Sequence, residues 1–185
     1  MSVINEGHIA TLRDWGADKV DHPGGTLLAH LVRTARDLED WGASDDLVLA
    51  ALFHAAYGTD GFAPSLINLS QRELLQSIVG AAAEATIYRY ASCDRKATYP
   101  TIKEGKKAAF IDRYAGGTTA MSDADIQTFV ELTIANELDL VEHNDDFAAE
   151  FGPILFDIFS GWTHLASGHA VAKLNHLASN APKTE

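Results

Sequence analysis

The sequence predicts an all-α, single-domain helical bundle, and three observations carry this prediction. Apolar residues recur every three to four positions through most of the chain, as on one face of a helix. Capping residues and glycines separate these segments. No strand pair stands out. Because 46% of the 185 residues are hydrophobic, one sizeable core can form. We therefore expect residues 1–180 to be one domain and residues 181–185 to be a disordered tail.

Two of the expected helices form a hairpin near the N-terminus. The first begins after the N-cap Thr26 and stops at Gly42, which suits the left-handed conformation at a helix end. The second begins after Ser44 and ends at His54. A shorter amphipathic helix over residues 8–18 precedes the pair.

In the rest of the chain, the residues that begin and end helices are spaced less regularly. Residues 70–73 read as a capping box that opens a helix reaching about Asp94. Residues 96–121 are the least regular and predict a lid or variable loop, with one helix over residues 106–114. Ser122 caps a long helix. The remaining expected features are a loop over residues 144–146, a break near Gly152 and Pro153, and a last helix over residues 168–178.

Composition narrows the class of protein. The net charge is −12 and the basic residues are scattered, so we expect no nucleic-acid partner, which needs a basic face. No apolar run is long enough to cross a membrane, and the first residues lack the pattern of a signal peptide, so we expect no membrane association. Cys93 is the single cysteine, which agrees with a reducing compartment. The expected location is the cytoplasm.

Two inward-facing histidines mark the candidate site. His30 lies on the apolar stripe of its helix, and His54 lies on the stripe of the next. A histidine on an apolar face is usually a core residue with a satisfied partner, but two that face each other raise the chance of a site. Tyr57 and Asp60 follow His54 where the chain turns. The predicted catalytic residues are therefore His30, His54, Tyr57 and Asp60.

Further polar residues are predicted to bind a substrate. Arg95 could hold a phosphate or carboxylate in a bidentate grip, or it could only pair with Asp94. Asn136 lies among apolar residues of the long helix, where a polar group needs a partner. The predicted substrate-binding residues are His22, Thr59, Tyr88, Asp94, Arg95 and Asn136.

The order of these motifs resembles the HD-domain superfamily, and within it the guanosine tetraphosphate hydrolase branch. His30 and His54 are 24 residues apart, AALFHAAYGTD resembles the stretch around the family's His-Asp pair, and IANEL at residues 134–138 resembles its distant metal-binding run. The chain also resembles small bacterial and fungal proteins of this superfamily. The residues that fit their shared pattern are His22, His30, Trp41, Phe53, His54, Tyr57, Gly58, Thr59, Cys93, Asp94, Arg95 and Asn136.

The resemblance implies a divalent-metal site, and the chain departs from it at the carboxylates. Ala55 stands where the family has a metal-binding Asp, and Asn136 stands where it has the last one. Gly58 and Thr59 replace the family's Glu-Asp. His30 and His54 remain as candidate ligands if manganese, iron or zinc binds, with His22, Asp60 or Glu137 needed to complete the site. The alternative is a pocket without a metal.

These observations favour an enzyme with a rebuilt histidine-lined pocket on an HD-like fold. The expected substrate is a small molecule, phosphorylated or otherwise anionic, and the chemistry is metal-assisted or histidine acid–base catalysis. One alternative is a non-catalytic small-molecule binding or regulatory protein, and a second is a metal-dependent oxygenase. The sequence leaves open whether the chain forms a homo-oligomer.

Overall fold

The computed structural model describes residues 2–103 and 105–180, and this part of the chain is mainly α-helical, as predicted. Its two strand pairs are short and antiparallel. The helices are α1 (Glu6–Asp14), α2 (Leu27–Asp40), α3 (Asp45–Leu52), α4 (Arg72–Val79), α5 (Ala81–Ser92), α6 (Arg95–Thr98), α7 (Asp123–His143), α8 (Asp145–Ser160) and α9 (Gly168–Asn180). The strands are β1 (Asp21–His22), β2 (Gly25–Thr26), β3 (Ala109–Ile111) and β4 (Thr118–Ala120). The expected tail, residues 181–185, lies outside the described residues.

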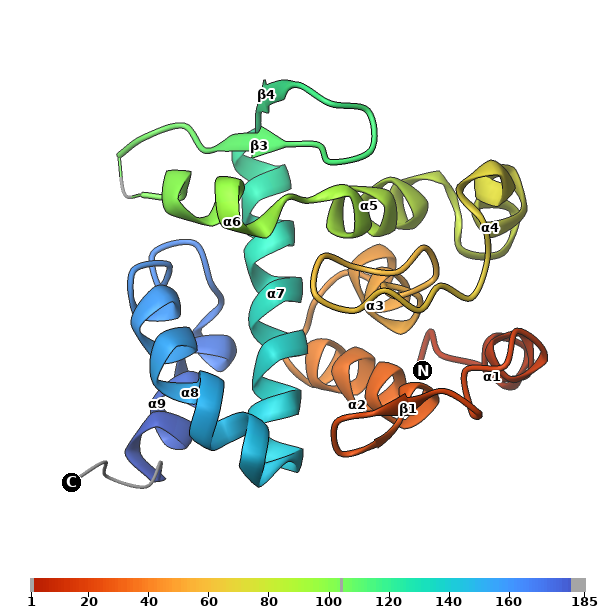
Figure 1. Ribbon diagram of the computed structural model, residues 1–185, viewed down its shortest axis with the longest axis horizontal. Coiled ribbons are helices and arrows are strands. Elements are labelled where there is room, and N and C mark those ends of the chain that lie inside the picture. The colour runs from red at the N-terminus through yellow and green to blue at the C-terminus, as the bar shows by residue number, and fades with distance from the viewer. Residues whose placement is uncertain (1, 104, 181–185) are drawn as a thin grey trace.

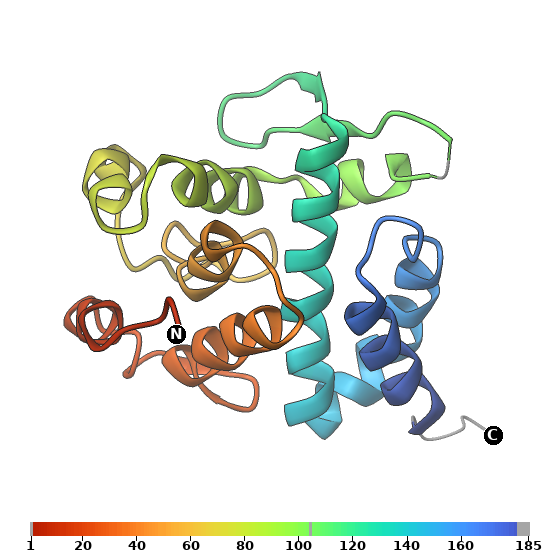
Figure 2. The ribbon, with the colours of Figure 1, turned by 180° about the vertical axis from the view of Figure 1, so that it is seen from behind.

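The long helix α7 is the axis of the molecule. Figures 1 and 2 show α1 to α5 on one side of α7 and α8 with α9 on the other. Every residue from Phe129 to Val141 is buried, so this stretch has no solvent-facing side. Its polar members, such as Asn136 and Asp139, must therefore find partners inside the protein.

The predicted helical hairpin forms as the capping residues indicate. The Thr26 hydroxyl accepts a hydrogen bond from the Ala29 amide at the start of α2, and the Ser44 hydroxyl accepts one from Leu47 at the start of α3. Gly42 separates the two helices with a φ of 77°. The helix α3 ends at Leu52, so His54 lies in the turn that follows it.

Four local predictions were wrong. The capping box is formed by Asn68 and Gln71, where the Asn68 backbone N–H donates to Oε1 of Gln71 at 2.9 Å, and not by Ser70 and Glu73. The expected helix over residues 106–114 is instead strand β3, paired with β4 across a turn that contains two glycines. Residues 144–146 begin α8 rather than forming a loop, since Asn144 caps that helix.

The fourth wrong prediction is the helix break near Gly152 and Pro153. Pro153 instead lies inside α8. Both Pro153 and Ala149, whose carbonyl the missing N–H would have bonded, are exposed. Water can therefore satisfy that carbonyl, and the helix continues.

Candidate functional site

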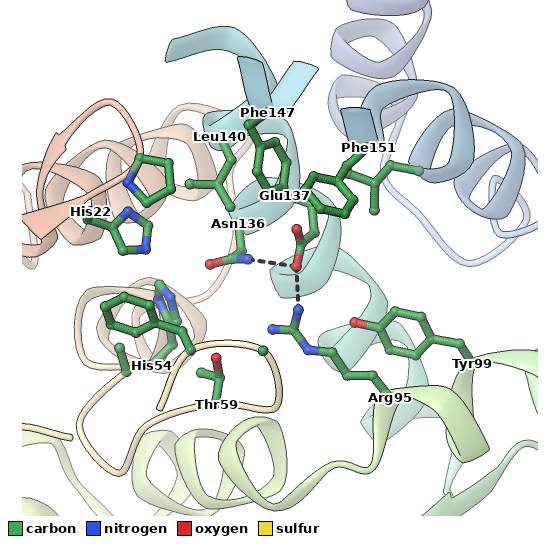
Figure 3. A pocket seen from close by; sticks show the side chains of 15 residues that line it. His22, His54, Thr59, Arg95, Tyr99, Asn136, Glu137, Leu140, Phe147 and Phe151 are labelled. Carbon is green, nitrogen blue, oxygen red and sulfur yellow. Dashed lines mark hydrogen bonds and ion pairs between the residues drawn. The ribbon is translucent and has the colours of Figure 1, made fainter. Parts of the chain in front are cut away.

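A pocket of about 320 Å³ lies against the middle of α7, and His22 and His54 are among the residues that line it (Figure 3). Its volume is typical of the lower end of small-molecule sites. One wall is apolar and comes largely from α7 and α8, with Leu140, Phe147, Phe151 and Leu155. The opposite side is polar. It consists of side chains from the β1–β2 turn, the turn after α3, α6 and α7, namely His22, His54, Thr59, Arg95, Asn136 and Glu137.

His54 presents an uncharged ring to this pocket. Its side chain is 2% exposed, and its Nδ1 donates to the Ala51 carbonyl at 2.7 Å. Burial lowers the pKa of His54 well below its ordinary value of 6.5, and the neighbouring His30 lowers it further. With the proton on Nδ1, Nε2 carries a lone pair, and it makes no hydrogen bond within the described part of the chain. Nε2 can therefore accept a proton or a hydrogen bond from a bound molecule.

His30 lies behind the pocket in a buried ionic cluster. Its Nδ1 donates to Asp139 at 2.6 Å, and its Nε2 faces Oδ1 of Asn136 at 3.0 Å. Both ring nitrogens of His30 are therefore engaged within the protein. Arg33 donates to both oxygens of the same carboxylate, at 2.7 and 2.9 Å. Burial alone would raise the pKa of Asp139, but hydrogen bonds from His30 and Arg33 outweigh it and lower this pKa to about 2.

A chain of hydrogen bonds connects this cluster with Arg95. The Asn136 amide donates to Oε1 of Glu137 at 3.0 Å, and Arg95 donates to the same oxygen at 2.6 Å (Figure 3). Arg95 also donates to the Tyr90 hydroxyl at 3.0 Å. Its backbone N–H donates to Oδ2 of Asp60 at 2.8 Å, which fixes the start of α6. Asp60 thus positions Arg95 and does not itself line this pocket.

His22 covers the outer side of His30. The two rings stack with centroids 4.2 Å apart, and Phe62 contacts the His22 ring edge-on at 4.8 Å. Burial lowers the pKa of His22 from 6.5 to about 4, with a further contribution from the charge of His30. His22 is therefore neutral at physiological pH, as His54 is.

The other predicted site residues lie outside the pocket. The Tyr57 hydroxyl donates to Glu84, which also pairs with Arg72. The Tyr88 hydroxyl donates to Asp112 at 3.1 Å. Asp94 is the N-cap of α6 and accepts a hydrogen bond from the Ala97 amide rather than pairing with Arg95. Of the ten predicted residues, the pocket gathers His22, His54, Thr59, Arg95 and Asn136.

Sequence reasoning missed the carboxylate at the centre of the cluster. Asp139 is fully buried, and it follows Asn136 by one turn of α7. An acidic residue between Leu138 and Leu140 in an apolar helix is a signal that could have identified it. Arg33 and the aromatic residues of α8 carried no comparable signal, because only the tertiary structure brings them to the site.

The residues present do not fit the divalent-metal site that the resemblance implies. Within residues 2–103 and 105–180, no three His, Cys, Asp or Glu side chains come together as a metal site would require. Both ring nitrogens of His30 already face protein oxygens. The methyl group of Ala55 and the amide of Asn136 offer no negative charge at the positions of the family's carboxylates. The buried carboxylate of Asp139 is already paired with Arg33 and His30.

Comparison with known proteins adds one similarity. Residues 11–95 match the model of a family described as a domain of unknown function (DUF6817). This stretch runs from within α1 to the first residue of α6, so it contains His22, His30, His54 and Arg95 but not α7. No curated protein and no solved structure matches the chain. Among the described helices, none is long and apolar enough to cross a membrane.

We expect Tyr57→Phe to lower stability without affecting the pocket. The change removes one buried hydrogen bond to Glu84 and leaves Arg72 paired with that carboxylate. The expected loss in the free energy of unfolding is about 1 kcal/mol, measured by urea denaturation. Binding of a pocket ligand should not change. A large loss of binding at unchanged stability would instead place Tyr57 in the site.

We expect the protein to lose stability as the pH falls from about 6.5 toward 4. The pKa of His22 is lowered to about 4 and that of His54 well below 6.5, so both rings bind protons more readily in the unfolded chain. The stabilising effect is complete above pH 6.5 and is lost as the pH falls. His22→Gln should make the decline shallower, whereas the exposed His169→Gln should not. Urea unfolding at pH values across this range measures the free energy of unfolding. A value that does not change with pH would contradict the lowered pKa values of His22 and His54.

Proposed function

We propose that the protein is a small-molecule enzyme on an HD-like fold that uses His54 for acid–base catalysis. The observation that carries the proposal is the neutral His54 ring, which lines the pocket. Its Nδ1 is fixed by the Ala51 carbonyl, while Nε2 makes no hydrogen bond to the residues that the structure describes. A base held in one tautomer next to a cavity is the arrangement that proton transfer needs. We further propose that it acts in the cytoplasm.

The buried groups behind His54 support this role. The ring of His30 contacts the ring of His54 edge-on at 5.2 Å. The interaction with His30 adds to burial in disfavouring a charge on His54, so the ring is unprotonated in the resting protein. Asp139 and Arg33 fix His30 in turn. Arg95 and Asn136 line the same pocket as donors that can orient a substrate.

A non-catalytic binding protein is the second candidate. The observation that favours it is that His30, the other histidine of the motif, has both ring nitrogens engaged within the protein. Proton transfer at the pocket would then depend on His54 without help from His30. Turnover, as distinct from binding, separates the two candidates.

The proposal is tested by profiling the turnover of a metabolite mixture with purified protein and with two tryptophan variants. Leu155→Trp adds bulk at the pocket wall, whereas Ile154→Trp adds it at the adjacent position of α8, which is 59% exposed. We expect a compound that the wild type and Ile154→Trp consume and that Leu155→Trp does not. Binding lost in Leu155→Trp with no turnover by any form would support the binding protein. Turnover that Leu155→Trp leaves intact would show that the reaction occurs elsewhere.

A further inference from the structure

The charged side chains that line the pocket neutralise each other, and this restricts the kind of ligand that the pocket can bind. Arg95 and Glu137 are the charged side chains among the described residues that line it, and they pair at 2.6 Å. His22 and His54 are neutral at physiological pH. Behind them, Asp139 pairs with both His30 and Arg33, and none of these three side chains lines the pocket. The lining therefore offers no net positive charge to an anion.

Arg95 is also largely committed to the protein. Its Nη1 donates to Glu137 and its Nη2 to Tyr90, while the Asn136 amide donates to the same Glu137 oxygen. A phosphate would have to displace Glu137 from both donors, leaving a carboxylate that is 5% exposed without its cation. Removing one partner of a buried pair is strongly unfavourable. Anion binding at Arg95 is thus opposed by the pocket's own carboxylate.

The opposite wall favours an apolar body. Phe147 and Phe151 of α8 lie with ring centroids 4.8 Å apart (Figure 3). Phe62, from the turn after α3, also lines the pocket. Phe151 is 40% exposed, so a ligand against it would bury apolar surface that now faces water. Aromatic faces also accept another ring in edge-on or offset packing.

One hydrogen-bonding position in the pocket has a fixed polarity. Because Nδ1 of His54 carries the proton and donates to Ala51, Nε2 can only accept. A bound molecule that places a hydroxyl or N–H group there gains a hydrogen bond, whereas an ether oxygen or a carboxylate does not. The same hydrogen bond would place a transferable proton on the proposed base.

We propose that the ligand is an uncharged molecule with an apolar, ring-sized body and one hydroxyl or N–H group that donates to Nε2 of His54. This inference rests on the proposed function and names its substrate class. It replaces the phosphorylated metabolite that the sequence alone favoured. The pocket volume, about 320 Å³, is equivalent to roughly ten water molecules at ~30 Å³ each, which suits a single substituted ring.

The test uses three probes of the same body: benzyl alcohol, benzyl methyl ether and benzyl phosphate. Binding is followed by NMR titration of histidine-labelled protein, with the His54 ring signals assigned by their loss in His54→Gln. We expect benzyl alcohol to shift these signals and to bind at least threefold more tightly than the ether. We expect benzyl phosphate to bind at least tenfold more weakly than benzyl alcohol.

Glu137→Gln tests the role of charge balance directly. Without the carboxylate, Arg95 becomes a free cation in the pocket, so benzyl phosphate should bind at least tenfold more tightly than it binds the wild type. Helical circular dichroism shows whether the variant is folded. If Glu137→Gln does not fold, the binding of the three probes to the wild type decides whether the pocket prefers an uncharged ligand.

The outcomes separate the inference from the proposed function. If benzyl phosphate binds the wild type as tightly as benzyl alcohol and shifts His54, the neutral substrate class is wrong and the pocket still serves a small molecule. Equal binding of the alcohol and the ether would overturn the donor requirement. If none of the probes shifts the His54 signals, the proposed pocket function fails together with the inference.

Discussion

Asp139→Ala is expected to lower the free energy of unfolding by about 3–5 kcal/mol. The carboxylate is fully buried and accepts hydrogen bonds from His30 and Arg33, which join α2 to α7. Without it, His30 and Arg33 would lose their shared hydrogen-bond acceptor, and the part-buried Arg33 guanidinium would lose its counter-charge. Chemical denaturation followed by circular dichroism measures the loss. The matched control is Asp18→Asn, an exposed carboxylate whose change should stay within about 0.5 kcal/mol.

The same carboxylate sets the behaviour of the protein in acid. The pKa of Asp139 is lowered to about 2 from 3.8, so its contribution is complete above pH 3.8 and is lost as the pH falls toward 2. This window lies below the one in which His22 becomes protonated. In Asp139→Asn the loss of stability below pH 3.8 should therefore be smaller than in the wild type. Equal stability of Asp139→Ala and the wild type would contradict the central place of this cluster.

His54→Gln is expected to lower the rate of the proposed reaction by about 10²–10⁴-fold while the protein stays folded. Glutamine keeps an amide that can donate near the Ala51 carbonyl, but it has no basic nitrogen to present to the pocket. The loss of stability should remain near ~1 kcal/mol, the value of one hydrogen bond. The measurement is the turnover of the identified substrate, with helical circular dichroism recorded for each variant.

His169→Gln is the matched control, because His169 lies exposed at the start of α9. It should retain full activity. A His54→Gln variant that unfolds would make His54 a core residue. A folded variant with full activity would show that the base lies elsewhere.

The parts of the fold that sequence could predict are those set by local chemistry. Thr26 and Ser44 cap their helices through amides only three residues away, and Gly42 supplies a positive φ between them. The inward direction of His30 follows from helical periodicity, and His30 is buried. His54 is buried too, although it lies in the turn just after α3. These features depend on residues that are close in sequence, so they can be predicted from the sequence alone.

The parts that could not be predicted depend on residues far apart in the chain. His30 and Asp139 are 109 positions apart, and Arg95 and Glu137 are 42 apart. Periodicity places each of these residues inside the protein but does not say which partner it meets. The aromatic wall of α8 comes to the pocket because that helix packs against α7, which no local pattern of α8 specifies.

Local competition explains the remaining differences. Asn68 caps the chain two residues before Ser70, so the first of two available capping residues is used. In the segment around residues 106–114, the apolar residues Ala109 to Ile111 fit one turn of helix as well as a short strand. Pairing with Thr118 to Ala120 decides in favour of the strand. Such a choice depends on the pairing and not on propensity alone.

The central claim is that His54 is a neutral base held in one tautomer at the pocket. Long-range ¹H–¹⁵N NMR of the histidine side chains tests it directly, because it distinguishes the two ring nitrogens and reports which of them carries the proton. From about pH 8 to 5 we expect His54 to keep its proton on Nδ1, with Nε2 unprotonated, because burial lowers its pKa. A ring that is charged at pH 7, or that carries its proton on Nε2, would contradict the account.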